Sequence, residues 1–149
     1  MKRLGLIGLG GGAVAIAAVA AVTGFGRADD SAERCFTDGG DAAISACTQA
    51  IRSGRFGGPD LAAIYDNRAI ELREQGDYDR AIDDYSQAIR LDATITGAYA
   101  GRGLAYEGKA LSEQARTDYR KALAVAPKYD DGEWAHDTAR GRLAALGGQ

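Results

Sequence analysis

The side chains that could do chemistry are few in this chain. It contains one histidine, His136, and no Ser/His/Asp or Cys/His set can be assembled around it at a spacing that nucleophilic catalysis needs. Glu133 and His136 lie three residues apart on one expected helix, with Asp137 adjacent, and could ligate a metal. The alternative is that these acids complement the dipole of the helix N-terminus and that the histidine is packed or solvated. We adopt this alternative and expect no metal, no cofactor and no enzymatic activity.

Two pairs of opposite charge recur at a fixed distance along the chain. Arg68 and Asp84 are followed 34 residues later by Arg102 and Asp118. A catalytic pair would be unique, whereas recurrence in each unit indicates architecture. We therefore predict that each is an ion pair that ties the first helix of its unit to the second, or one unit to the next.

The same offset of 34 residues relates the stretch 62–95 to the stretch 96–129. Tyr65, Ala69 and Leu72 are spaced i, i+4 and i+7, which places them on one face of a helix. A second set with this spacing follows in the same stretch, so each copy is predicted to be a helical hairpin. The identical positions are Tyr65, Arg68, Ala81, Asp84, Tyr85 and Ala88 in the first copy and Tyr99, Arg102, Ala115, Asp118, Tyr119 and Ala122 in the second.

These positions resemble the pattern of the tetratricopeptide repeat (TPR) family, which ends each unit with a proline and separates its two helices with a glycine. Ala93 stands where the proline is expected in the first copy, and Ala110 where the glycine is expected in the second. The resemblance implies an all-α, TPR-like α-solenoid of helix-turn-helix hairpins. The matching residues are Tyr65, Ala69, Leu72, Gly76, Ala81, Tyr85 and Ala88, then Tyr99, Gly103, Tyr106, Ala115, Tyr119, Ala122 and Pro127.

The N-terminal segment has the layout of an export signal. Lys2 and Arg3 precede an uncharged apolar run from Leu4 to Phe25, and small residues lead to the expected cleavage site after Ala28, with a site near 22–24 as the alternative. Removal of residues 1–28 changes the formal net charge from −3 to −6, because only basic residues are lost. An acidic chain without a basic stripe is not expected to bind nucleic acid.

Two other interpretations of this segment are possible. The run 4–25 is long enough to remain as a membrane anchor, although it is rich in Gly and Ala. Gly8, Gly10 and Ala13 fit the dinucleotide-binding pattern G-x-G-x-x-A, which works only within a strand–helix–strand unit. The sequence after Asp30 predicts only helices, so we expect no strand–helix–strand unit.

A third, shorter unit precedes the two full copies. Residues 43–52 share six of ten positions with residues 81–90 at an offset of 38. Cys47 takes the place of the packing tyrosine, on the face turned toward the helix that carries Cys35. Two cysteines in an exported chain favour a disulfide, and a redox-active pair would normally show C-x-x-C spacing. We predict a structural Cys35–Cys47 disulfide that staples a truncated hairpin.

Short polar residues and glycines mark the helix ends. Ser31 and Asp41 are expected to cap the two helices of the truncated unit, and Asp77 the second helix of the first full repeat. Asp130 or Asp131 is expected to cap a last helix from Glu133 to Leu146, whose apolar side faces the repeats and whose other side is polar. Such a helix closes an array of repeats.

In the TPR family the first helix of each hairpin lines a concave groove, and the resemblance implies that a peptide or protein partner binds there. The family members that grip a terminal carboxylate use Lys, Arg and Asn at set positions. Only Asn67 fits that pattern here, so we expect no carboxylate clamp. The expected groove residues are Asp66, Asn67, Ile70, Arg73, Ala100, Gly101 and Leu104.

The sequence therefore predicts an exported, non-enzymatic scaffold for protein interactions, periplasmic or secreted. The alternatives are an accessory subunit of an envelope assembly, anchored in the inner membrane by an uncleaved N-terminal segment, and an enzyme. A further alternative is that the groove binds nothing and that the domain serves as a spacer or an oligomer unit. The expected segments are the signal 1–28, the truncated hairpin 31–54, the repeats 61–94 and 95–128, and the capping helix 131–146.

Overall fold

The computed structural model describes residues 30–147, which form seven α-helices and no strand. The predicted signal segment 1–28 and the dinucleotide-like pattern lie outside these residues. No helix within 30–147 is both long and apolar enough to cross a membrane. The helices are α1 (Ser31–Thr37), α2 (Gly40–Arg52), α3 (Gly58–Glu74), α4 (Tyr78–Leu91), α5 (Thr96–Gly108), α6 (Ser112–Ala124) and α7 (Gly132–Ala145).

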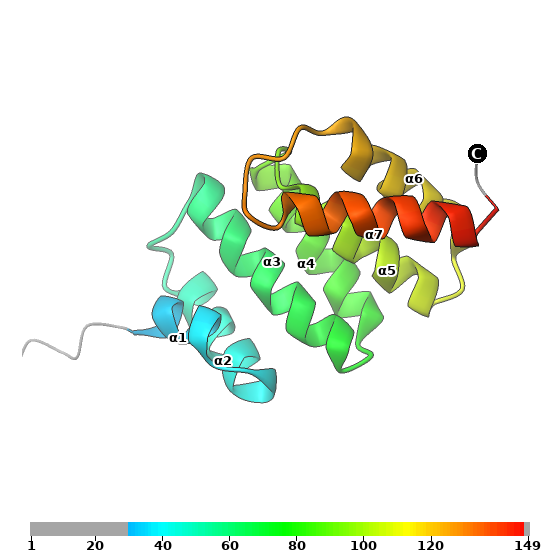
Figure 1. The fold of residues 1–149 in the computed structure, drawn as a ribbon. Helices are drawn as coiled ribbons and strands as arrows, with labels where there is room; N and C mark the ends of the chain where they lie inside the picture. The colour runs from blue at the N-terminus through cyan, green and yellow to red at the C-terminus, as the bar shows by residue number, and fades with distance from the viewer. Residues whose placement is uncertain (1–29, 148–149) are drawn as a thin grey trace, which may run out of the picture.

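The helices form two rows. Each helix packs against its neighbour in the chain, and α1, α3, α5 and α7 also contact one another in sequence, so the first helices of successive hairpins lie side by side. Helix α7 packs on both α5 and α6, in the place that the first helix of a further hairpin would take (Figure 1). This is the predicted TPR-like α-solenoid with its closing helix.

The core combines small residues with buried tyrosines. Tyr85 and Tyr119 are at most 1% exposed, although each is a large side chain with a polar hydroxyl. A Cβ at Gly101 would lie 2.5 Å from the Tyr85 ring, and one at Gly103 would lie 2.6 Å from the Tyr119 ring. The rings therefore fill the space that the glycines leave, as expected for close packing between helices.

The turns between the two helices of each full hairpin share one backbone conformation. Gly76 has a φ of +79°, and Ala110, 34 positions later, has a φ of +59°. Glycine adopts this left-handed region freely, whereas the Cβ of alanine meets the following carbonyl oxygen there. The departure from the family pattern at Ala110 thus leaves the turn intact at some cost in free energy.

Helix caps agree with the sequence in part. The Asp77 carboxylate accepts a hydrogen bond from the backbone N–H of Arg80 at 3.3 Å, as predicted. The predictions for Ser31 and Asp41 were wrong, because both lie inside their helices. Helix α2 begins at Gly40, two residues before the start expected from a cap at Asp41, and the backbone N–H of Gly40 donates to the carboxylate of Glu71 on α3 at 2.6 Å.

The predicted ion pairs are present in both full repeats. Arg68 on α3 holds Asp84 on α4 through two hydrogen bonds, from Nε at 2.6 Å and from Nη2 at 2.8 Å. Arg102 on α5 holds Asp118 on α6 in the same way, at 2.7 and 2.8 Å. A planar guanidinium matches a carboxylate with two parallel hydrogen bonds, which fixes orientation as well as distance.

The third nitrogen of each arginine reaches the preceding hairpin. Nη1 of Arg68 donates to the Thr48 hydroxyl of α2, and Nη1 of Arg102 donates to the Ser86 hydroxyl of α4, both at 2.9 Å. Each arginine therefore ties the two helices of its own repeat and also joins that repeat to the one before it.

The truncated hairpin is held by a disulfide. Cys35 on α1 and Cys47 on α2 are bonded across a Cα–Cα distance of 4.6 Å, and both are fully buried. They pack with Ala46, Ala50 and Ile64, which belongs to α3. The covalent link closes a short loop and lowers the entropy of the unfolded chain.

We predict that Arg68 and Asp84 are strongly coupled. Arg68→Ala and Asp84→Ala should each destabilise, since each leaves a buried partner unpaired, and their double mutant should be less destabilised than the sum by roughly 0.5–3 kcal/mol. The exposed pair Arg140 and Asp137, joined at 2.5 Å, is the control and should couple by less than about 0.5 kcal/mol. Chemical denaturation measures both cycles, and strict additivity for Arg68 and Asp84 would contradict the pairing.

We also predict that Ala110→Gly stabilises the chain by about 1 kcal/mol, because it relieves the left-handed strain. Gly76→Ala is the reciprocal control at the equivalent turn and should destabilise by about 1 kcal/mol. Thermal and urea unfolding of the two variants provide the measurement. A loss of stability in Ala110→Gly would show that this turn carries no such strain.

Candidate functional site

Two neighbouring cavities open between α3, the start of α5 and the segment that leads into α7. The first has a volume of about 290 Å³ and the second about 380 Å³, and they share Asp66 and Asp131. Together they form one groove along the row of first helices. The first is lined by Phe36, Pro59, Asp60, Ala63, Asp66, Asn67, Ile95, Tyr129 and Asp131, and the second by Asp66, Ile70, Arg73, Glu74, Tyr85, Gly97, Asp131 and Trp134.

The groove gathers the exposed aromatic surface of the described chain. Within residues 30–147, the large apolar side chains that are exposed are Phe36, Tyr129 and Trp134, at 53%, 37% and 47%. All three line the two cavities. Tyr129 is held in place because its hydroxyl donates to the Asp92 carboxylate at 2.5 Å. Exposed apolar side chains that gather at one place, unlike ones scattered singly, are a feature of interaction sites.

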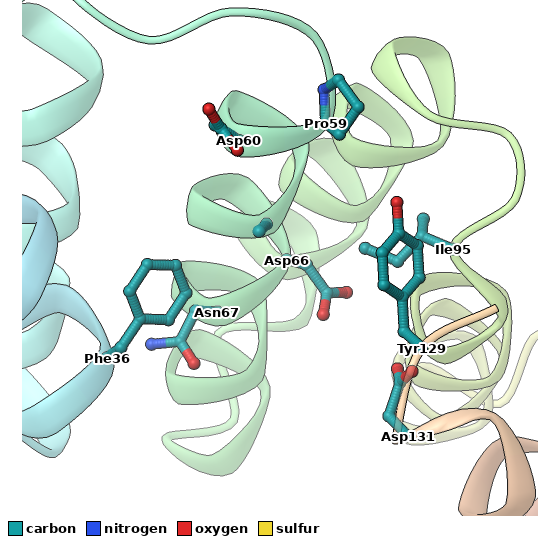
Figure 2. A pocket seen from close by; sticks show the side chains of 9 residues that line it. Phe36, Pro59, Asp60, Asp66, Asn67, Ile95, Tyr129 and Asp131 are labelled. Carbon is teal, nitrogen blue, oxygen red and sulfur yellow. The ribbon is translucent and has the colours of Figure 1, made fainter.

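Asp66 and Asp131 face each other across the floor of this groove. Figure 2 shows the Asp66 carboxylate directed toward the side of the cavity where Tyr129 and Asp131 lie, with Phe36 on the opposite side. Oδ1 of each carboxylate is buried and has no hydrogen-bond partner within the described residues. Buried polar atoms are usually paired, so two unpaired oxygens in residues that line the same cavities require an explanation.

The electrostatics of the two acids follow from this placement. Burial, with a smaller contribution from the Asp131 charge, raises the pKa of Asp66 to about 7, and Arg73 acts against the rise. Burial also raises the pKa of Asp131, while hydrogen bonds from the backbone N–H groups of Asp131 and Gly97 act to lower it. The groove therefore holds one carboxyl that titrates near neutral pH beside a second acid.

The position of Asp131 depends on a glycine. It occupies the residue before α7, as one of two predicted caps, but its side chain makes no capping hydrogen bond to that helix. Its Oδ2 lies instead against the first turn of α5, where a Cβ at Gly97 would be only 1.7 Å away. The partial positive charge at the N-terminus of α5 favours a carboxylate there.

The predicted groove residues fall into two groups. Asp66, Ile70, Arg73 and Asn67 line the cavities, although the Asn67 amide already donates to the backbone carbonyl oxygen of Cys35. Nε of Arg73 donates to the Tyr85 hydroxyl at 3.4 Å. That these residues bind a partner remains a prediction.

The second group is covered by other parts of the chain. Ala100 is fully buried in a cluster with residues of α7, and Leu104 packs against that cluster. Gly101 is buried beneath the Tyr85 ring. These three positions therefore do not line the cavities, because α7 lies across α5 where an open groove was expected.

The sequence reasoning missed Phe36, Tyr129, Asp131 and Trp134 as groove residues. A signal existed for Phe36, which lies outside the packing positions of the repeat, whereas Trp134 was expected on the apolar side of the capping helix and is instead 47% exposed. The residues considered for metal binding are otherwise engaged or dispersed: Nε2 of His136 lies 3.0 Å from the carbonyl oxygen of Val125, and residues 30–147 contain no group of three potential ligands.

We predict that Asp66→Asn makes stability less dependent on pH. The folded-state pKa of about 7 lies above the ordinary 3.8, so the wild-type carboxyl supports folding while protonated and loses that contribution as the pH rises toward and through 7. Asparagine stays neutral. The two proteins should differ least near pH 4, and the advantage of the variant over the wild type should grow by roughly 1–3 kcal/mol between pH 5 and pH 8.

Asp83→Asn is the matched control, because Asp83 is exposed on α4 and carries the same charge. Urea unfolding at the two pH values measures the difference. Parallel pH profiles for Asp66→Asn and the wild type would contradict the burial of an unpaired carboxyl at this position.

Comparison with known proteins agrees with the fold. Residues 69–109 match the family described as TPR repeat, and residues 96–129 match the family described as tetratricopeptide repeat. Tetratricopeptide repeat protein 36 of Xenopus tropicalis is 38% identical over an alignment of 75 residues, and the match covers 48% of this chain but only 37% of that protein.

Two solved structures are similar along most of the chain. The Arabidopsis OM64 TPR domain has a TM-score of 0.55 and 28% identity, with 68% of this chain and 80% of that chain covered. The second TPR domain of human RPAP3, in complex with the HSP70 peptide SGPTIEEVD, has a TM-score of 0.59 and 25% identity, with 73% and 82% covered. The sequence matches thus support the TPR repeat family for residues 69–129, and the fold is that of a TPR-like α-solenoid.

Proposed function

We propose that this protein is an exported, non-enzymatic scaffold that binds a peptide or protein partner in the groove shared by the two cavities. The observation that carries the proposal is the gathering of Phe36, Tyr129 and Trp134 around that groove. Aromatic side chains provide much of the binding energy at protein interfaces.

The fold and the comparisons support an interaction role. TPR domains are generally interaction modules without enzymatic activity, and the similar RPAP3 domain was solved with a bound peptide. The groove of the present chain differs from a carboxylate clamp, because Asp66 and Asp131 on its floor would repel a peptide's terminal carboxylate. A lone peptide in so short a groove should bind with micromolar affinity, about −8 kcal/mol.

The export part of the proposal rests on residues 1–28. The basic start, the apolar run and the small residues before Asp29 support cleavage and a periplasmic or secreted location. The disulfide in the truncated hairpin fits an oxidising compartment. The alternative is an accessory subunit anchored through an uncleaved segment, and the two differ in whether the purified protein begins at Asp29 or at Met1.

The experiment is affinity capture from the native envelope fraction with matched variants. Ala63→Arg places a long side chain in the first cavity and should abolish capture of the partner, whereas Ala144→Arg, on an exposed position of α7 outside both cavities, should leave it unchanged. Mass spectrometry identifies the captured protein and the N-terminus of the bait. Capture that persists in Ala63→Arg would overturn the groove as the binding site.

A further inference from the structure

The aspartates of this fold differ in whether an arginine pairs with them. Asp84 and Asp118 are 6% and 3% exposed, and each is held by two hydrogen bonds from an arginine of the neighbouring helix. Asp66 and Asp131, in contrast, each leave a buried Oδ1 without a hydrogen-bond partner within residues 30–147. Asp66 and Asp131 are half-buried, and no arginine of the described chain holds either of them as Arg68 and Arg102 hold the acids of the repeats.

The nearest basic side chain does not fill the gap. Of the described basic groups, only Arg73 acts to lower the pKa of Asp66. Its guanidinium is engaged elsewhere, with the Tyr85 hydroxyl at 3.4 Å and with Glu74 at 3.5 Å. The space between the two carboxylates is therefore short of positive charge.

We infer that the groove anchors its partner through an arginine side chain, whose guanidinium enters the space between the Asp66 and Asp131 carboxylates. This inference rests on the proposed function and adds the chemistry of the partner. A guanidinium carries five N–H donors in one plane, enough to donate to two carboxylates at once. It also stacks on aromatic faces, which Phe36 supplies in the first cavity and Trp134 in the second, whereas the Tyr129 ring already carries the Lys128 ammonium on one face, 4.9 Å from its centroid.

Other cations fit the site less well. A metal ion such as Ca²⁺ needs six to eight oxygen ligands, and the described residues contain no group of three potential metal ligands. A lysine ammonium is a compact charge that would meet one carboxylate well and stack poorly on the aromatic walls. The negative net charge of the chain favours a basic partner over an acidic one.

Binding should depend on pH. The groups that face Asp66 are Asp131, Arg73, Glu74 and Tyr85, and the first cavity also carries Asp60 and Tyr129. A cation binds the ionised form of Asp66 better, so the affinity should rise as the pH passes through the pKa of about 7.

The test uses the single tryptophan, Trp134, as a fluorescence reporter in the mature protein. The probe is the capped peptide acetyl-Gly-Gly-Arg-Gly-Gly-amide, and its control replaces arginine by citrulline, which keeps the shape and removes the charge. The arginine probe should bind at least about tenfold more tightly than the citrulline probe at pH 8, with a smaller ratio at pH 6. Replacement of arginine by lysine should weaken binding severalfold.

Substitutions test whether the arginine probe binds at Asp66 and Asp131. Asp66→Asn and Asp131→Asn should each weaken the arginine probe by about tenfold while circular dichroism stays helical, whereas Asp83→Asn, an equal charge change on the exposed side of α4, should not. Equal binding of the arginine and citrulline probes to the wild type would overturn the inference, and that comparison needs no variant to fold. Tight binding of Ca²⁺ alone, without binding of the arginine probe, would also overturn it.

The failure of this inference is distinct from that of the proposed function. A captured partner that is lost in Ala63→Arg but binds Asp66→Asn as well as the wild type would leave the groove in place and remove the arginine anchor.

Discussion

The bidentate pair of arginine and aspartate is the interaction on which the rest of this fold depends. It joins the two helices of each full repeat and, through Thr48 or Ser86, reaches the repeat before it. The truncated hairpin lacks the pair, because Ala46 stands at the position equivalent to Asp84. The Cys35–Cys47 bond lies one residue further on, where the other units have their packing tyrosine. A covalent link thus replaces both the ionic and the aromatic contact in the shortest unit.

The acids of the groove, in contrast, are not paired with arginines of the described residues. Where the repeats pair each buried acid with an arginine, the groove brings together Asp66 and Asp131 with an unpaired oxygen each. Such an arrangement costs stability in the free protein, and sites that trade stability for binding are a recurrent feature of functional surfaces. The exposed aromatic side chains around the same cavities are consistent with this view, since their apolar surface stays in contact with water until a partner covers it.

Much of the fold could be predicted because it is periodic. Arg68 and Asp84 were assigned to an ion pair only because they recur as Arg102 and Asp118, and the spacing of Tyr85 among alanines defined a buried helix face. The groove was harder, because it is formed where the repeat ends. Whether Ala100 is open or covered depends on where α7 lies, and no repeat position encodes that. Asp131 precedes α7 as an ordinary cap would, and only the three-dimensional structure directs its carboxylate toward Gly97.

The measurement that tests this view most directly is the titration of the Asp66 side-chain carboxyl by carbon-detected NMR in the free protein. A buried carboxyl without a cationic partner should titrate with a pKa near 7. The chemical shift should move toward that of the ionised form when the arginine peptide is added at pH 6. A pKa close to the ordinary 3.8, unchanged by the peptide, would show that Asp66 is already solvated or paired and would contradict the role assigned to the groove.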